Sequence, residues 1–266
     1  MAIHLEAQKL LFIMVPGTGC SVVGKAMRLQ MGGLWLPETD VYENGRKVMS
    51  RKHHDLEQLI RYGILSQDQR KDIQVFATIR NPFDRLTTYW QRMAGGWNSE
   101  SFEVRRRELR RQIEQLGERE VAHRLDDLGR QERAARRRAF LAKAVGFNLW
   151  LRRTIHQFER QDSLATDPDA ARFERLFPLT NGVDSLIRYE RLADGVHQML
   201  RSAGCNIELD IPQANRTPGK RPFNSYWNSF SVRLMNKCYG PILDRVGYSV
   251  DGVVGESAAL LEGGLS

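Results

Sequence analysis

The residues that could carry chemistry begin in a short stretch near the start of the chain. An apolar run, LLFIMV, is followed directly by Pro-Gly-Thr-Gly-Cys-Ser and then by helix-like sequence. A glycine-containing turn between a strand and a helix points several backbone N–H groups at one place, where the helix dipole also favours negative charge. We therefore expect this turn to bind an anion, with contacts from Gly17, Thr18, Gly19, Cys20 and Ser21.

Two phosphate-binding patterns fit this turn. Read from Gly19, the letters GCSVVGKA match the G-x-x-x-x-G-K loop of nucleotide kinases and triphosphatases, but Ala26 stands where a Ser or Thr would hold magnesium. Read from Pro16, the letters PGTGCS resemble the 5′-phosphosulfate loop of sulfotransferases, usually P-K-T-G-G-T-S. The first pattern predicts a P-loop kinase and the second a sulfotransferase.

A second motif favours the sulfotransferase interpretation. The segment Phe76–Met93, FATIRNPFDRLTTYWQRM, is very similar to the 3′-phosphate segment of carbohydrate-type sulfotransferases, typically R-N-P-F-D-R-L-x-S-x-Y. Arg80 stands at the arginine position, and Thr88 replaces the serine while keeping the hydroxyl. An arginine at a strand end beside a helix N-terminus suits a dianionic phosphate. The later segments SLIRYERL and NRTPGKRPFNSYW also resemble parts of this family, the first as an architectural segment.

The resemblance implies a fold, a donor and a reaction. The family has an α/β nucleotide-binding core of the P-loop nucleotide-kinase type. Its members move a sulfuryl group from 3′-phosphoadenosine 5′-phosphosulfate (PAPS) to an acceptor hydroxyl, here expected on a carbohydrate such as a glycan or glycolipid. The reaction requires no metal, and no nucleic-acid partner is expected.

The chain departs from the family pattern at Gly17, where the family loop has a lysine. That lysine neutralises charge on the bridging oxygen as the sulfuryl group leaves. Lys25, Lys52 and Arg221 are candidate substitutes, and we favour Lys52; Lys220 and Arg221 are also possible nucleotide contacts. The departure leaves a second hypothesis open, in which a sulfotransferase-like module binds the nucleotide or a polyanion without turnover.

The candidate general base lies between the two motifs. The segment RKHHDLEQLIRYG contains Lys52, His53 and His54 ahead of an amphipathic helix, where related sulfotransferases often have a K-H pair. Histidine suits proton removal at neutral pH. The resemblance makes Lys52 and His53 the catalytic candidates, with His54 as the alternate base and Glu43 or Asp55 as further alternatives.

The elements that must position these residues form an α/β pattern. Apolar runs bounded by turn signals predict buried strands at Leu10–Val15, Ile73–Ile79 and Ser185–Tyr189, each followed by helical sequence. One helix is expected to begin at Pro82, and another to run from near Glu190 to Gly204. The alternation predicts an open parallel sheet flanked by helices.

Length and composition predict one domain over residues 1–266, and the resemblance implies that it is a sulfotransferase domain. Residues 100–153 form a helical insert or lid within it, rich in Arg and Glu and interrupted by Gly117 and Gly129. A solvated helical hairpin with surface ion pairs is one interpretation of this insert, and a basic lid that recruits an acidic acceptor is the other.

Charge and cysteine content indicate the kind of partner and the cellular compartment that we expect. The formal net charge of +8 suits an anionic partner. Three cysteines form no disulfide framework, which favours a reducing cytoplasm, and LLFIMV is too short for a membrane span. Cys20 is expected at a helix N-terminus, a position that can lower a thiol pKa.

Overall fold

The computed structural model describes residues 1–44, 46–95, 98–212, 221–254 and 260–262 of the chain. The chain divides into two compact units. Unit 1 comprises Met1–Pro82, Phe158–Arg216 and Asn236–Ser266, and unit 2 comprises Phe83–Gln157 and Thr217–Met235. That these units act as one sulfotransferase domain stays a prediction.

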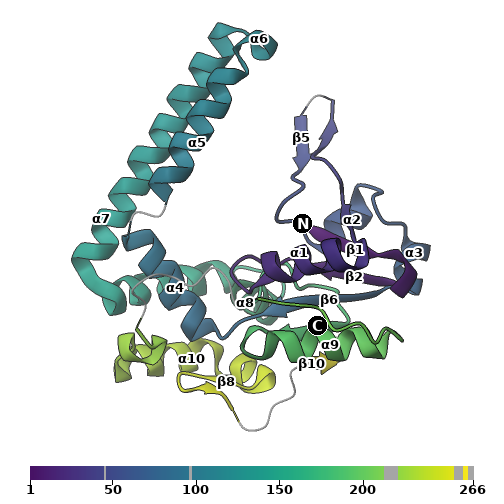
Figure 1. The fold of residues 1–266 in the computed structure, drawn as a ribbon. Helices are drawn as coiled ribbons and strands as arrows, with labels where there is room; N and C mark the ends of the chain where they lie inside the picture. Colours follow the sequence, from purple (N-terminus) through teal and green to yellow (C-terminus); the bar gives the residue numbers. More distant parts are fainter. Residues whose placement is uncertain (45, 96–97, 213–220, 255–259, 263–266) are drawn as a thin grey trace. The chain divides into compact units, whose positions relative to one another are not determined.

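A six-stranded sheet forms the centre of unit 1, with its strands in the order β10-β7-β6-β2-β1-β3 (Figure 1). The three strands that the apolar runs predict are confirmed as β2 (Leu10–Ile13), β6 (Gln74–Ile79) and β7 (Ser185–Arg188). β6 lies between β2 and β7 and is parallel to both. Every residue of β2 and β7 is buried, as is typical of the centre of a parallel sheet.

The prediction of a parallel sheet holds for these central strands only. β1 (Ala2–Leu5) pairs antiparallel with β2 and with β3 (Leu34–Leu36), and β10 (Leu260–Glu262) pairs antiparallel with β7. The short turn η1 (Glu6–Gln8) joins β1 to β2, and so short a connection can join only antiparallel neighbours. The sheet is therefore mixed.

Two helices, α1 (Cys20–Met31) and α9 (Leu192–Ser202), cover one face of the sheet. Their apolar side chains share one buried cluster with alternate residues of the strands, which point to the same side. Burial of each large side chain in this cluster contributes about 1.5–3 kcal/mol. The cluster includes Leu10, Phe12, Met14, Val23, Met27, Phe76, Val196, Met199 and Leu200. The helix predicted from near Glu190 is α9, and it begins after a 3-10 turn, η2 (Tyr189–Arg191).

The other elements assigned to unit 1 are short. They are the hairpin β4 (Val41–Glu43) and β5 (Arg46–Met49), the hairpin β8 (Tyr248–Ser249) and β9 (Gly252–Val253), and the helices α2 (Leu56–Arg61), α3 (Gln67–Asp72) and α8 (Pro168–Leu176). The last part of α10 (Ser229–Val246) also belongs to unit 1.

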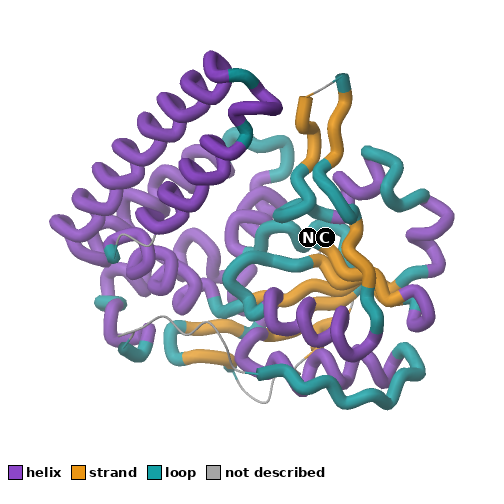
Figure 2. Tube along the Cα trace, turned by 45° about the horizontal axis from the view of Figure 1, so that its top comes forward, coloured by secondary structure: helices purple, strands orange, loops and turns teal. Residues whose placement is uncertain are grey.

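Unit 2 is helical in its described part. It contains most of α4 (Pro82–Ala94), then α5 (Asn98–Arg111), α6 (Ile113–Leu116) and most of α7 (Glu118–Asp162), followed by η3 (Phe223–Tyr226) and the start of α10. α4 begins at Pro82 as predicted. α5 and the first half of α7 lie side by side in both views (Figures 1 and 2) and are joined by an ion pair between Arg106 and Glu132.

The glycines of this helical segment act differently from the prediction. Gly117 follows the end of α6 with φ 80°, as predicted. Gly129 lies inside α7 and does not interrupt it, because a single glycine costs a helix only about 1 kcal/mol. The break falls instead at Gly146, where φ is 75° and ψ is 170°. Among the described residues, no helix has both the length and the apolar character needed to cross a bilayer.

Candidate active site

The turn between β2 and α1 places two glycines in left-handed backbone conformations. Gly17 has φ 83° and Gly19 has φ 76°, values that glycine adopts without steric cost. A Cβ on Gly19 would lie 2.7 Å from Leu192 Cδ2 and 3.1 Å from Tyr189 Cδ2, whereas Gly17 faces open space. The turn is therefore closely packed at Gly19 and open to a ligand at Gly17.

The position at which α1 begins distinguishes between the two phosphate-binding patterns that fit the sequence. The helix begins at Cys20, directly after Gly19. Gly24 therefore lies inside the helix, where a Cβ would meet Met14 Cε at 2.9 Å, and Lys25 is exposed on the helix surface. In a G-x-x-x-x-G-K loop these residues would form the phosphate-binding loop itself. The geometry favours the shorter pattern over residues 16–21.

Thr18 holds the turn against β6 through its hydroxyl. Its Oγ1 donates to Val15 O at 2.7 Å and lies 2.5 Å from Thr78 Oγ1. Because the Thr18 hydroxyl has one proton, Thr78 is the donor in the second bond. An anion in the turn would therefore meet the backbone N–H of Thr18 rather than its side chain. Ser21 is exposed on the first turn of α1.

Arg80 connects the ends of two parallel strands. It follows β6 directly, its Nη1 donates to Gly17 O at 3.0 Å, and its guanidinium lies 4.5 Å from the centre of the Tyr189 ring. A guanidinium can bond a carbonyl and stack on an aromatic ring at the same time, which fixes its position. The structure thus brings the arginine of the second motif to the glycine turn of the first.

Glu190, just after the end of β7, supports this arrangement. Its Oε1 accepts from Asn81 N at 2.9 Å and its Oε2 accepts from Tyr248 OH at 2.8 Å. Burial, followed by the negative charge of Glu190, raises the pKa of Tyr248 well above its ordinary value. The phenol therefore stays protonated and donates. Glu190 holds the chain immediately after Arg80 in place.

A pocket of about 410 Å³ opens beside Gly19. This volume lies in the ~300–1,000 Å³ range of small-molecule sites. The starts of α1 and α9 and the chain after α9 line it, with contributions from Gly19, Val22, Tyr189, Leu192, Ile211 and Pro212. The pocket therefore adjoins the turn at Gly19, and its lining includes Tyr189, the residue on which Arg80 stacks.

The comparison with protein families agrees with these motifs. A family model described as "Sulfotransferase family" matches residues 2–234. This chain belongs to the sulfotransferase family. Searches of curated proteins and of solved structures gave no match. The family assignment makes the chain a transferase of sulfuryl groups, and the roles of the K-H pair stay predictions.

The segment that carries this pair follows β5 in a turn held by Asp40. The Asp40 carboxylate accepts from Arg51 N at 2.6 Å and pairs with Lys47 at 3.4 Å. The hydrogen bond from Arg51 N is the main cause that lowers the pKa of Asp40 below its ordinary value. His53 is exposed and has φ 61°. For a residue other than glycine such a conformation costs about 1–3 kcal/mol, and Lys9, Asn44 and Leu179 of this chain also adopt it.

The two histidines have different environments. His54 is fully buried, its Nδ1 lies 3.1 Å from Ser50 O, and its Nε2 has no hydrogen-bond partner among the described residues. Burial, then the positive Met1 amine, lowers the pKa of His54 to about 4. Partial burial, the Met1 amine and Lys52 lower the pKa of His53 below 6.5. Both rings are neutral at neutral pH, and His53 is the one that solvent reaches.

The first residue of the chain connects this segment to the turn. Met1 O accepts from Met14 N at 2.8 Å, which places Met1 at the end of β2. Burial lowers the pKa of the Met1 amine to about 5, while Cys20 raises it and Arg51 and Lys52 lower it further. Met1 therefore lies at the strand end that leads into the turn.

Cys20 differs from the prediction for a thiol at a helix N-terminus. Its side chain is buried in the apolar cluster under α1. Burial raises the pKa of the Cys20 thiol, so the expected lowering is wrong. Desolvation outweighs the helix dipole here, because the thiolate would lose its water in an apolar environment. The described cysteines, Cys20, Cys205 and Cys238, are all free, as predicted.

The remaining predicted nucleotide contacts are Thr88, Lys220 and Arg221. Thr88 is buried in the part of α4 that belongs to unit 2. Arg221, also in unit 2, stacks on Tyr226 with its guanidinium carbon 5.0 Å from the ring centre, and Lys220 lies outside the described residues. Their positions as nucleotide contacts stay predictions.

The two alternative carboxylate bases are also located. Asp55 caps α2, since its side chain accepts from Gln58 N at 2.8 Å. Its carboxylate is thereby held by the helix. Glu43 is exposed at the end of β4. Both stay alternative predictions for the base.

Sequence reasoning did not predict the residues whose contacts hold the turn and Arg80 in place. Thr78, Tyr189, Glu190 and Tyr248 make the hydrogen bonds and the stacking contact described above. For Tyr189 and Glu190 the available signal was their place directly after the buried strand β7. Over the described residues, no group of three or more His, Cys, Asp and Glu side chains is placed to hold a metal; the prediction of metal-free chemistry stays untested.

Proposed function

We propose that this protein transfers a sulfuryl group from PAPS to an acceptor hydroxyl, with a carbohydrate as the acceptor. One observation carries the proposal: the Arg80 guanidinium is bonded to Gly17 O at the adjoining ends of two parallel strands. A single nucleotide with phosphate groups at both its 3′ and 5′ positions fits a cation and an N–H-lined turn that lie side by side. We further infer a P-loop nucleotide-kinase-like core.

The donor would lie along the carboxyl ends of β2 and β6. In this arrangement the backbone N–H groups of Thr18, Gly19 and Cys20 and the positive end of α1 hold the 5′-phosphosulfate. Arg80 holds the 3′-phosphate, and a contact from Thr88 stays the prediction made from the motif. The pocket beside Gly19 supplies apolar walls at Leu192 and Ile211.

Lys52 is the proposed replacement for the family lysine. It is exposed in the turn after β5 and directly precedes His53, as in the K-H pair of related sulfotransferases. Lys25 lies about 7.5 Å along the axis of α1 from the first residue, at 1.5 Å per residue, and is exposed on its surface. A flexible lysine from the turn after β5 can neutralise charge on the leaving oxygen, the role that Gly17 cannot fill.

His53 is the proposed base. Its lowered pKa keeps the ring neutral, so that it can accept the proton of the acceptor hydroxyl. The acceptor oxygen forms a bond to sulfur as the bond from sulfur to the bridging oxygen breaks. The proton passes to His53, and adenosine 3′,5′-bisphosphate leaves with the electron pair. His54 is buried, so its ring positions the turn rather than meeting substrate.

The test is a transfer assay with PAPS and a panel of glycans and glycolipids, following release of adenosine 3′,5′-bisphosphate. The expected result is acceptor-dependent release that His53→Ala slows about 10²–10⁴-fold. His123→Ala, an exposed histidine of α7, is the matched control and should keep full turnover. Release that does not depend on any acceptor, or unchanged turnover in His53→Ala, would contradict the assignment.

Gly17 favours one other function, a module that binds the nucleotide or a polyanion without turnover. Binding of adenosine 3′,5′-bisphosphate together with no transfer to any acceptor would support it. A P-loop kinase would instead require binding of ATP with magnesium, and absence of such binding would discard it. The cytoplasmic location predicted from the free cysteines also belongs to this proposal.

A further inference from the structure

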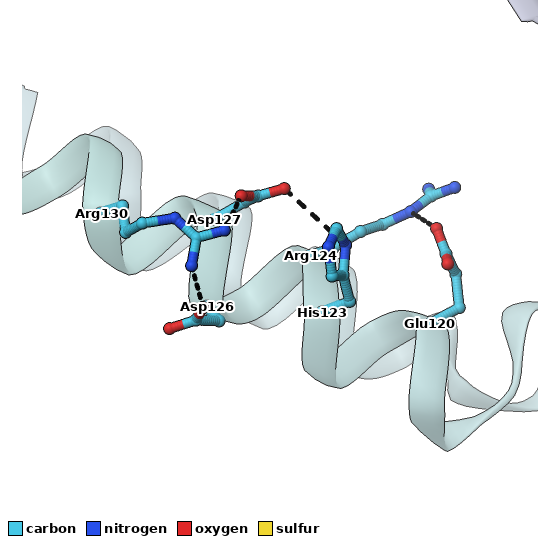
Figure 3. Close-up of polar contacts among 6 residues, drawn as sticks. All are labelled: Glu120, His123, Arg124, Asp126, Asp127 and Arg130. Carbon is cyan, nitrogen blue, oxygen red and sulfur yellow. Dashed lines mark hydrogen bonds and ion pairs between the residues drawn. The ribbon is translucent and has the colours of Figure 1, made fainter.

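Two consecutive stretches of α7 use their charges in opposite ways. Residues 118–130 carry four acidic side chains and three arginines. Figure 3 shows how they pair along the helix: Arg124 binds Glu120 at 2.7 Å, Arg130 contacts both Asp126 and Asp127, and His123 lies 3.8 Å from Asp127. This stretch neutralises itself, as a solvated helix surface commonly does.

Residues 131–143, QERAARRRAFLAK, carry one carboxylate and five basic side chains. The carboxylate, Glu132, is already bound by Arg106 of α5 and by Arg136. Arg133, Arg137 and Lys143 make no ion pair with any described residue. Within the described parts of the chain, the one polar contact of the Arg138 side chain is a hydrogen bond to Ala134 O at 3.4 Å. The stretch therefore presents positive charge that no described residue balances.

Two large apolar side chains are exposed within this positive surface. Phe140 is 71% exposed and Leu141 is 45% exposed. At 100° per residue, Arg133, Arg137, Phe140 and Leu141 fall within about 100° of the helix circumference, which makes them one stripe. Ala142, in contrast, is buried within unit 2. We call this stripe and its flanks the basic face of α7: Arg133, Arg137, Arg138, Phe140, Leu141 and Lys143.

We propose that the basic face of α7 docks onto the surface of an anionic lipid bilayer. Arginine and lysine side chains would pair with lipid phosphates, and Phe140 and Leu141 would enter the boundary between headgroups and acyl chains. The helix would lie on the bilayer without crossing it. This binding goes beyond the transfer reaction and does not depend on it.

Other partners fit the basic face less well. A nucleic acid or a polyanionic glycan would use the cations but leave exposed apolar surface without a partner, above all at Leu141. A second copy of the chain in a two-fold contact would set one cationic stripe against another. A lipid surface is the partner that satisfies both the charges and the apolar side chains.

The test is co-sedimentation of the full chain with phosphatidylcholine vesicles that contain or lack phosphatidylserine, at physiological salt. Binding is expected only with phosphatidylserine. The double variant Arg133→Gln, Arg137→Gln should weaken it about 30-fold, and Phe140→Ala with Leu141→Ala about 10-fold. Because these side chains are exposed, circular dichroism and thermal melting should not change.

Matched controls remove the same charge or the same apolar surface elsewhere. Arg119→Gln with Arg201→Gln, and Leu164→Ala, all at exposed positions, should bind vesicles like the wild type. Equal binding to vesicles with and without phosphatidylserine, or equal loss in the controls, would overturn the proposal. Failure to bind vesicles together with arginine-dependent binding to heparin or RNA would overturn it as well and assign the surface to a polyanion.

Discussion

The strand-end site of unit 1 and the basic face of α7 in unit 2 hold their cations in opposite ways. At the strand ends, Arg80 is fixed by Gly17 O and by the ring of Tyr189, over a turn whose threonine is buried. On α7, Arg133 and Arg137 stand in solvent without an ion pair to any described residue. Arginine therefore has a fixed position at the strand ends of unit 1, whereas the arginines on the basic face of α7 are exposed to solvent.

This difference explains which of the two regions can recognise one particular ligand. A cation held before the ligand arrives needs no reorganisation when it binds, so it can recognise one group at one distance. Exposed cations lose rotamer freedom on binding and are screened by salt over about 8 Å at physiological ionic strength. We expect substitutions to have large, ligand-specific effects at the strand ends and smaller, salt-dependent effects on α7.

The largest effect is expected at His53, next to the strand ends. His53→Ala should lower kcat about 10²–10⁴-fold, because a positioned general base is lost. In the wild type, kcat/KM should fall on acidification through a pKa below 6.5, since burial and nearby positive charge favour the neutral ring. A pH–rate profile checks this directly.

The same profile distinguishes the two histidines. An acidic limb near pH 4 would point to His54 instead, whose pKa is lowered to about 4. A limb that persists unchanged in His53→Ala would rule out His53 as the base. His123→Ala serves as the control for loss of an exposed imidazole.

The next largest effect is expected on the free energy of unfolding, from a matched pair of glycine substitutions in the turn. Gly17→Ala should lower the free energy of unfolding by about 1–2 kcal/mol, the cost of a left-handed alanine. Gly19→Ala should cost about 2–5 kcal/mol, because its Cβ would also meet the side chains of Leu192 and Tyr189. Denaturant unfolding measures both, and equal losses would mean that Gly19 is not packed as described.

The smallest effect concerns Glu132, the buried carboxylate of α7. Burial acts to raise its pKa, but the hydrogen bonds and charges of Arg136 and Arg106 outweigh burial and lower it. A lowered pKa in the folded state means that this carboxylate stabilises the fold at neutral pH, and that the contribution is lost as the pH falls through the lowered value. Glu132→Gln should therefore reduce the acid dependence of unfolding, while Glu114→Gln at an exposed position should leave it unchanged.

Local sequence patterns were enough to predict the central strands of the sheet and the start of α4. The strands β2, β6 and β7 are long apolar runs with turn signals, and the start of α4 is set by Pro82. Two motifs far apart in the sequence predicted that the turn and Arg80 would meet. Parallel neighbouring strands bring both to the same edge of the sheet.

Other features depend on contacts that sequence patterns do not record. The inward turn of the Thr18 hydroxyl depends on Thr78, on a strand sixty residues later. The raised pKa of Cys20 comes from desolvation in the packed core, a tertiary effect that exceeds the local helix dipole. β3 and β10 are only three residues long, too short for a periodic signal, so their antiparallel pairing was not expected.

The most direct measurement is the affinity for adenosine 3′,5′-bisphosphate by calorimetry, with Arg80→Ala and the exposed control Arg201→Ala. The wild type and Arg201→Ala should bind equally. Arg80→Ala should bind at least about 100-fold more weakly, since it loses charge-assisted hydrogen bonds to a phosphate. Equal affinity in Arg80→Ala, or no binding by the wild type, would contradict a shared nucleotide site at the two strand ends.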